Sequence, residues 1–415
     1  MSDVDEEMRE LKRRLRGVRY LMIVPIPVFR DVAGAIWLDR LWARDLLRHL
    51  DYLSDVILMC PVRDLPAGGV ADTIRLREVP PGLRFLPLPD PPGMLRSVLG
   101  LPRLMAASIA AVRQADIVHS GAIGGAIPPG LVINPTAVMM RRPLVIVIES
   151  TPWRGDGLSR NWRDRLRGFL SERLARWSAR RASLLICTHE GYATDFGAAS
   201  RGKVMVTPAS WIDQADVINP AQAEQAWRAK PDPPRFLLAA RLHEGKGIGV
   251  ALDAMKAADS QGLAVALDII GDGPMRDAVA AQAAALRTAR LRLLDPVPYG
   301  RDFMQLIRQY HAVVVPSLTS EQPRILYDAF SQAVPALASD TSGHCESVLP
   351  GQTGIRFARN DPVSMLGAMT ASRSDDLRQL GMGARDWVCG RTHQAMHLAR
   401  ARVLAADFGK RGAGV

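Results

Sequence analysis

The sequence is poor in cysteine and in long apolar runs, and each shortage excludes a class of protein. Its four cysteines lie far apart and form no C-x-x-C pair, which opposes a zinc site or a disulfide framework built on them. No apolar run reaches the roughly 18 to 20 residues of a spanning helix, and residues 1–16 lack the apolar stretch of a signal peptide. We therefore expect a cytoplasmic protein.

Lysine is also scarce, because arginine supplies most of the 53 basic residues. The net charge of +11 predicts a partner of opposite sign, such as a nucleotide, a nucleic acid or an anionic lipid. The basic residues accompany helical apolar patterns and no nucleic-acid recognition module, so we expect no nucleic-acid partner.

The densest basic segment is residues 160–181, RNWRDRLRGFLSERLARWSARR. Its apolar residues recur at helical spacing while arginines occupy much of the rest of the helix surface (Trp162, Leu166, Phe169, Leu170, Leu174 and Trp177). This pattern suits a helix that lies on an anionic membrane, such as the inner face of the plasma membrane, in a peripheral association. It equally suits a surface helix whose stripe packs on its own domain.

Apolar runs of strand length alternate with helical segments along the whole chain, which predicts an α/β protein with parallel sheets. One series of strands is expected near residues 20–25, 55–60, 117–119, 144–149, 184–188 and 204–207, with helices such as 36–53 and 95–113 between them. A second series is expected near 235–240, 264–270, 291–294, 312–316 and 334–338. The glycines after the first strand do not form G-x-G-x-x-G, which disfavours a hydride-transferring dinucleotide enzyme.

A chain of 415 residues exceeds what one core usually organises, so we expect two domains. Proline clusters at 219–220 and 230–234 mark the boundary between the two strand series. The predicted division is an N-terminal Rossmann-like domain (1–212), a C-terminal Rossmann-like domain (213–390) and a C-terminal helical segment (391–415) that crosses back to the first domain.

Two cations follow the first strand of the second series. Arg241 comes directly after the run 236–240, and Lys246 lies five residues later, just before Gly247. Fixed positive charge where a strand leads into a helix suits a bound diphosphate, since the helix amides point the same way. Without the motifs that follow, a solvated loop is the simpler interpretation.

Two further motifs follow Lys246 in the second series. Gly271-Asp272-Gly273-Pro274 ends an apolar strand, and these glycines permit close approach of a ligand or form a plain tight turn. Farther on, Pro316-Ser317 precedes Glu321 and Asp328, and carboxylates at such positions can accept hydrogen bonds from vicinal hydroxyls of a sugar or a ribose. Glu321 would hold the transferred sugar and Asp328 the ribose, although two such acids also occur on solvated helix starts.

Taken in this order, these residues resemble the retaining glycosyltransferases of GT-B architecture, the family-four type that includes bacterial mannosyl- and glucosyltransferases. The resemblance covers most of the second half and extends to Gly343-His344-Cys345-Glu346, which matches the family's G-x-x-E. It implies two Rossmann-like domains that face each other across a cleft, and a donor site formed by Gly34, Gly271 and Gly273 together with the charged residues (Arg241, Lys246, Glu321 and Asp328).

The sequence also departs from the family pattern. The acidic pair is one residue shorter and ends in Asp328, Ala333 replaces a usual glycine, and Gly34 stands alone where many members have paired glycines. Where relatives have a histidine near the reacting centre, this chain has Glu149. Glu149, with His119 and His189 at other strand ends, makes the candidate acceptor side, and a structural role is the alternative for each.

By resemblance, the protein is a metal-independent, retaining hexosyltransferase that uses a nucleoside-diphosphate sugar as co-substrate and needs no other cofactor. Arg241, Lys246 and Glu321 would be its catalytic residues. The acceptor would be a glycan or a lipid-linked sugar. A GT-B sugar-nucleotide epimerase and a non-catalytic partner protein that binds nucleotide sugar remain the alternatives.

Overall fold

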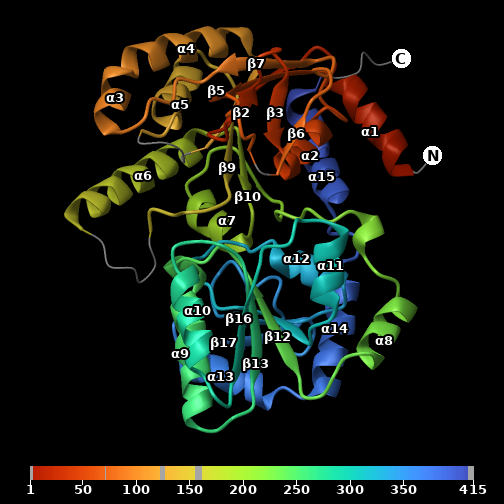
Figure 1. Ribbon diagram of the computed structural model, residues 1–415. Helices are drawn as coiled ribbons and strands as arrows, with labels where there is room; N and C mark the ends of the chain where they lie inside the picture. The colour runs from red at the N-terminus through yellow and green to blue at the C-terminus, as the bar shows by residue number, and fades with distance from the viewer. Residues whose placement is uncertain (1–2, 71, 122–126, 155–160, 410–415) are drawn as a thin grey trace.

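The protein is described here by a computed structural model that covers residues 3–70, 72–121, 127–154 and 161–409. Two lobes, each built on a parallel β-sheet, lie one above the other in Figure 1. The predicted α/β architecture of two Rossmann-like domains is confirmed.

The upper lobe contains a seven-stranded sheet in the order β11-β10-β9-β8-β1-β4-β7. Every pairing within it is parallel, and the central strands are almost wholly buried, as apolar runs covered on both faces must be. The strands are β1 (Arg19–Ile23), β4 (Asp55–Cys60), β7 (Leu83–Pro87), β8 (Ile117–Ser120), β9 (Leu144–Ile148), β10 (Leu184–Cys187) and β11 (Lys203–Val206).

Helices cover both faces of this sheet, and their apolar sides form two separate core clusters with it. They are α1 (Asp3–Arg14), α2 (Arg40–His49), α4 (Leu101–Gln114), α5 (Gly130–Met139), α6 (Trp162–Arg181) and α7 (Glu190–Gly197). The short helix α3 (Met94–Leu99) has no buried residue. Neighbouring helices α4, α5 and α6 pack against one another in series, and α6 projects to the left of the upper lobe in Figure 1.

The lower lobe contains a six-stranded parallel sheet in the order β14-β13-β12-β15-β16-β17. This is the doubly wound order: strands β12 to β14 are added on one side of the sheet, and from β15 onward they are added on the other side. The strands are β12 (Arg235–Ala239), β13 (Ala266–Ile270), β14 (Arg290–Leu294), β15 (Ala312–Val315), β16 (Ala336–Ser339) and β17 (Gly354–Phe357), and the helices are α8 (Pro220–Arg228), α9 (Ile248–Ser260), α10 (Arg276–Ala285), α11 (Arg301–Arg308), α12 (Ile325–Ser331), α13 (Pro362–Ala371) and α14 (Ser374–Val388).

The chain crosses between the lobes twice. Residues 207–213 lead down from β11, and residues 389–392 lead back up to α15 (His393–Phe408), which packs against α1 and α2. Leu398, Ala401 and Leu404 belong to the same core cluster as β1 and β4. The last helix therefore completes the core of the upper lobe, whereas the exact boundaries at 212 and 390 stay a prediction and residues 410–415 lie outside the described chain.

Two predicted helices differ from the structure. Residues 36–53 form strand β3 (Ile36–Asp39) before α2, because Asp39 caps the helix by accepting a hydrogen bond from the Trp42 amide. Residues 95–113 form α3 and α4, which meet at Gly100. A small sheet in the order β5-β2-β3-β6 was not predicted from the sequence. In it β3 pairs with β2 (Val28–Arg30) and β6 (Thr73–Arg75), and β2 pairs in turn with β5 (Val62–Asp64).

Candidate active site

A cavity of about 380 Å³ lies between the lobes, at the carboxyl ends of β9, β12 and β15. The upper lobe contributes Glu149, Ser150 and Thr188 to its wall, and the lower lobe contributes residues of the loops after β12 and β15. In open parallel sheets this edge, where the strand order reverses, is the usual place for a ligand.

Arg241 and Lys246 both line this cavity. Lys246 ends the short turn η2 (Glu244–Lys246), and Gly247 then begins α9 with φ +71°. A Cβ atom at Gly247 would lie 1.8 Å from the Pro316 carbonyl oxygen, so only glycine lets the start of α9 pack against the end of β15. That packing sets Lys246 beside the loop that follows β15.

Glu321, from that neighbouring loop, is paired with Lys246. The Lys246 Nζ lies 2.6 Å from Glu321 Oε2, and the two side chains are 16% and 24% exposed. The structure therefore brings together three residues that the sequence separates by up to 80 positions, and Glu321 balances the ammonium charge of Lys246.

A second cavity of about 420 Å³ adjoins the first and shares Arg241 with it. Its wall is largely apolar, with Trp211, Val297 and Phe303, as suits the flat face of a base or ring. Asp328 lies in this wall, 3% exposed, and accepts a hydrogen bond from the Tyr299 hydroxyl at 2.8 Å. Burial raises the pKa of Asp328 to about 7, and the Tyr299 hydrogen bond opposes that rise.

The two glycines of the predicted turn, Gly271 and Gly273, have φ of +150° and +147°. A Cβ at Gly271 would lie 1.9 Å from the Ala240 carbonyl oxygen, and one at Gly273 would lie 2.6 Å from the Leu242 carbonyl oxygen. The close packing of the loops after β12 and β13 therefore requires both glycines, whether or not a ligand also approaches them. Only Gly271 lines one of the two cavities.

Gly34 lies in the β2–β3 hairpin, where its amide donates a hydrogen bond to the Asp31 carbonyl at 2.9 Å. It lines neither of the two cavities between the lobes, and a Cβ there would meet nothing within 4 Å. The structure does not bring this glycine to the other predicted donor residues, because the loop after β1 folds into the small sheet.

Glu149 is the candidate acceptor residue that the structure does place in the cavity wall. Its side chain is open to the cavity yet surrounded by protein, and this burial raises its pKa, with the nearby Arg400 opposing the rise. A carboxyl with a raised pKa in a cleft is suited to proton transfer.

His119 and His189 line neither cavity. His119 Nδ1 lies 2.9 Å from the Tyr20 hydroxyl, and burial lowers its pKa to about 3. His189 is fully buried at the start of α7, where Nδ1 accepts a hydrogen bond from the Tyr192 amide, and burial lowers its pKa to about 4. Their partners favour the structural role for both histidines.

The G-x-x-E segment joins the two lobes. The Glu346 carboxylate accepts a hydrogen bond from the Glu190 amide at the start of α7, and burial raises its pKa. Gly343 packs so closely that a Cβ would lie 2.3 Å from the Glu321 carbonyl oxygen. This motif therefore supports the loop that carries Glu321 and fastens it to the upper lobe.

Two residues of these cavities were not predicted from the sequence. Arg324 lines both cavities, and its guanidinium lies 4.5 Å from the Trp211 ring centroid. Tyr299 holds the Asp328 carboxylate. Their positions in the sequence could have indicated them, since Arg324 lies between the two predicted acids and Tyr299 follows the strand β14.

Comparison with known proteins finds a family match within the lower lobe. Residues 233–375 match the model of the family described as glycosyl transferases group 1. Over 162 residues, 38% of this chain, the sequence is 30% identical to the D-rhamnosyltransferase WbpZ of Pseudomonas aeruginosa. That region spans 41% of the rhamnosyltransferase. Residues 233–375 are thus similar to the glycosyl transferases group 1 domain.

Solved structures resemble the chain along nearly its whole length. Sucrose-phosphate synthase from Thermosynechococcus elongatus superposes with a TM-score of 0.69 at 16% identity, over 94% of this chain and 99% of that chain. Anabaena HepE in complex with UDP-glucose gives a TM-score of 0.63 at 16% identity, over 94% and 99% of the two chains. The fold is therefore GT-B, as the resemblance in sequence predicted.

Proposed function

We propose that the protein is a glycosyltransferase that moves a hexose from a nucleoside-diphosphate sugar to a hydroxyl of a glycan or lipid-linked acceptor. The observation that carries this proposal is the convergence of Arg241 and Lys246 on one cavity between the lobes. The group 1 domain and the GT-B fold support it.

Arg241 and Lys246 would bind the diphosphate and stabilise its negative charge as the bond to the sugar breaks. Interactions that strengthen as charge develops accelerate the step itself and do more than tighten binding. These two cations can supply that stabilisation without a metal ion. The transferred sugar would then be attacked from the face of the leaving group, with retained stereochemistry.

Asp328 and Glu321 would bind hydroxyl groups of the donor. Asp328 lies in the apolar second cavity, where a base could stack and the carboxyl could meet the ribose. Glu321 would exchange its present partner, Lys246, for sugar hydroxyls once the diphosphate has attracted the lysine. Glu149, on the opposite wall, is the candidate group for orienting or deprotonating the acceptor.

A thermal-shift screen tests donor binding. Uridine, guanosine and adenosine diphosphates and their sugars are added singly, and a ligand that binds the folded state must raise the melting temperature. We expect one base to stabilise the protein and the Lys246→Ala variant to lose most of that shift. A protein that none of these nucleotides stabilises would contradict the proposal.

Product analysis separates the alternatives. An epimerase would convert the donor without an acceptor, and a non-catalytic partner would bind it without converting it. A transferase needs both substrates, and NMR of the new glycosidic bond reports whether the configuration is retained.

We propose further that α6 brings the protein to an anionic membrane surface. The first half of α6 exposes Trp162, Leu166, Phe169 and Leu170, each at least 51% exposed, and buries only Gly168. The buried residues of its second half are also small (Ala175, Ser178 and Ala179). The stripe therefore does not pack on its own domain along this half; Arg160, where the predicted segment began, lies outside the described residues.

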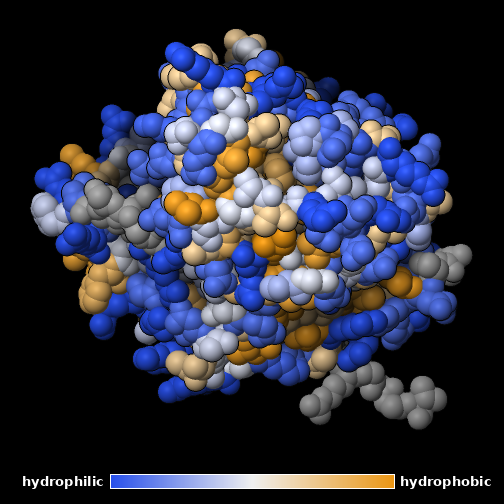
Figure 2. All heavy atoms as spheres, turned by 90° about the horizontal axis from the view of Figure 1, so that it is seen from below, coloured by the Kyte–Doolittle hydropathy of each residue, from blue (hydrophilic) through white to orange (hydrophobic). Residues whose placement is uncertain are grey.

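The surroundings of α6 support this proposal. Exposed arginines accompany the apolar residues on α6, and α3 adds Leu95 and Leu99 at 74% and 72% exposure. Seen from below, Figure 2 shows hydrophobic patches in the middle of a mostly hydrophilic face. A few more hydrophobic side chains lie at its left edge, the side on which Figure 1 draws α6. Among the described residues, no helix combines the length and apolarity needed to cross a membrane.

Sedimentation with vesicles tests the surface. We expect binding to phosphatidylglycerol-containing vesicles and not to pure phosphatidylcholine, because cationic helices need anionic lipid. The double variant Phe169→Ser, Leu170→Ser should lose binding to the phosphatidylglycerol-containing vesicles. Val363→Ser is the control, since Val363 is an even more exposed apolar residue on α13 of the other lobe. Unchanged binding of the double variant would contradict the proposal.

A further inference from the structure

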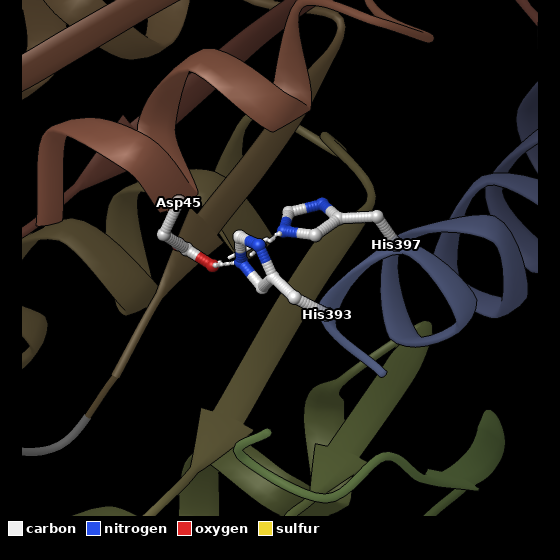
Figure 3. A group of neighbouring side chains, drawn as sticks. All are labelled: Asp45, His393 and His397. Carbon is white, nitrogen blue, oxygen red and sulfur yellow. Dashed lines mark hydrogen bonds and ion pairs between the residues drawn. The ribbon is translucent and has the colours of Figure 1, made fainter. Parts of the chain in front are cut away.

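Three potential metal ligands converge where α2 meets α15, outside both cavities. His393 and His397 lie one turn apart on α15, and Asp45 faces them from α2 (Figure 3). The two Nε2 atoms and Asp45 Oδ1 are each 3.1 Å from the other two. Both imidazoles are fully buried.

Hydrogen bonding alone does not account for this triangle. Three equal edges give an angle of about 60° at Asp45 Oδ1, whereas the lone pairs of a carboxylate oxygen lie about 120° apart. Each Nε2 also offers either one proton or one lone pair, so the three edges cannot all be hydrogen bonds. Three potential ligand atoms gathered this closely are the usual arrangement around a bound cation.

The dimensions suit a first-row transition metal. Zinc–nitrogen and zinc–oxygen bonds of about 2.0–2.1 Å place tetrahedral ligand atoms about 3.3 Å apart, close to the separation seen here. An ion at that bond length would lie about 1 Å out of the plane of the three atoms, which leaves its remaining coordination positions on one side. Imidazole and carboxylate are ligands that zinc prefers.

We propose that Asp45, His393 and His397 bind a zinc ion that clamps the returning helix α15 to α2. The site lies beside both connections between the lobes: the His393 amide donates to the Ile212 carbonyl at 2.8 Å, and the His393 ring stacks on Trp211. An ion there would hold the two crossing segments in one place. It takes no part in the proposed transfer chemistry.

The surroundings set the expected strength of the site. The Tyr52 hydroxyl lies 3.3 Å from His397 Nδ1 and can fix the orientation of that ring. Arg400, on the same helix and 7% exposed, adds a positive charge nearby that weakens cation binding. We therefore expect reversible binding that a strong chelator removes.

Competition with a chromophoric chelator measures zinc binding directly. The full-length protein is freed of any polyhistidine tag, stripped of metal and titrated with Zn²⁺, and one ion per chain is expected. His393→Gln should lower the affinity at least tenfold, since even loss of an outer partner of a ligand costs 10- to 100-fold. Zn²⁺ should also raise the melting temperature of the unmodified protein and leave that of the variant unchanged.

Asp45→Asn provides a second variant that keeps the shape of the side chain, should His393→Gln fail to fold. His311→Gln is the matched control, because His311 is another buried histidine, in the lower lobe, whose Nδ1 accepts from the Arg235 amide. Failure of the unmodified protein to bind Zn²⁺ would overturn the proposal. The proposal would also be overturned if the ligand variants bound Zn²⁺ as tightly as the unmodified protein, or if the control lost as much affinity as they do. The cluster would then be a set of polar contacts that joins two helices.

Discussion

Replacing Glu321 with glutamine should tighten the binding of a nucleoside diphosphate and slow sugar transfer. In the structure, the Glu321 carboxylate holds Lys246 at 2.6 Å. An incoming diphosphate must draw Lys246 away, so separating the pair offsets part of the binding free energy. Glutamine keeps the size of the side chain and removes the charge that competes with the phosphate.

The exposure of the pair sets the magnitude. Fully exposed ion pairs contribute about 0.2–1 kcal/mol, and breaking a buried pair costs about 3–5 kcal/mol. With side chains 16% and 24% exposed, this pair lies between those limits, and we take about 1–2 kcal/mol. The diphosphate should then bind about 5- to 30-fold more tightly. Transfer should slow about tenfold or more, because the sugar loses a charged hydrogen-bond acceptor.

Isothermal titration calorimetry with the nucleoside diphosphate that stabilises the protein measures the first effect. Glu244→Gln is the matched control, since Glu244 is exposed in the same loop as Lys246. We expect the control to change the Kd by less than about twofold, as is usual for an exposed charge. Equal or weaker binding by Glu321→Gln would refute the idea that phosphate replaces this carboxylate as the partner of Lys246.

Further expectations concern single residues of the lower lobe. Lys246→Ala should lower kcat by roughly a hundredfold while the melting temperature falls by only a few degrees, because the partly exposed pair with Glu321 is lost; equal turnover would remove Lys246 from the catalytic role. Burial raises the pKa of Asp328 from 3.8 to about 7, so the folded state binds the extra proton. The free energy of unfolding should therefore fall as pH rises from about 4 to about 7 and then level off. Asp328→Asn should flatten that fall in urea unfolding, and parallel pH profiles would contradict the assignment. Gly247→Ala should destabilise by about 2–4 kcal/mol, because of its positive φ and the Pro316 carbonyl. Gly249→Ala in the same helix, where a Cβ meets nothing within 4 Å, should be neutral or gain up to about 1 kcal/mol in a thermal melt.

The second sheet was the easiest part to predict. Its central strands are largely buried, so they appear as mainly apolar runs, and those of β13 and β15 end at Gly271 and Pro316. The ordered motifs after β12 and β15 then placed Arg241, Lys246 and Glu321 at one sheet edge, because the carboxyl ends of parallel strands meet there.

The small sheet was not predictable in the same way. Its strands have three or four residues each and partly exposed side chains, so they carry no clear period. The segment 36–39 continues an apolar pattern into α2, and the Asp39 cap was the signal that could have divided strand from helix.

The histidine cluster depends on contacts that no local pattern contains. His393 and His397 have helical spacing, which a search for H-x-x-x-H could have found, but Asp45 lies about 350 positions away. Glu346 is similar: its motif was recognised, whereas its bond to the start of α7 depends on how the lobes meet.

The return of α15 to the upper lobe has a consequence for how this chain is made. Leu398, Ala401 and Leu404 fill the same core as β1, the first strand to be synthesised. On the ribosome, the hydrophobic core of the first lobe therefore stays incomplete on one side until almost the entire polypeptide has emerged. A stalled or prematurely ended translation product would expose that apolar surface and become a substrate for chaperones or proteases.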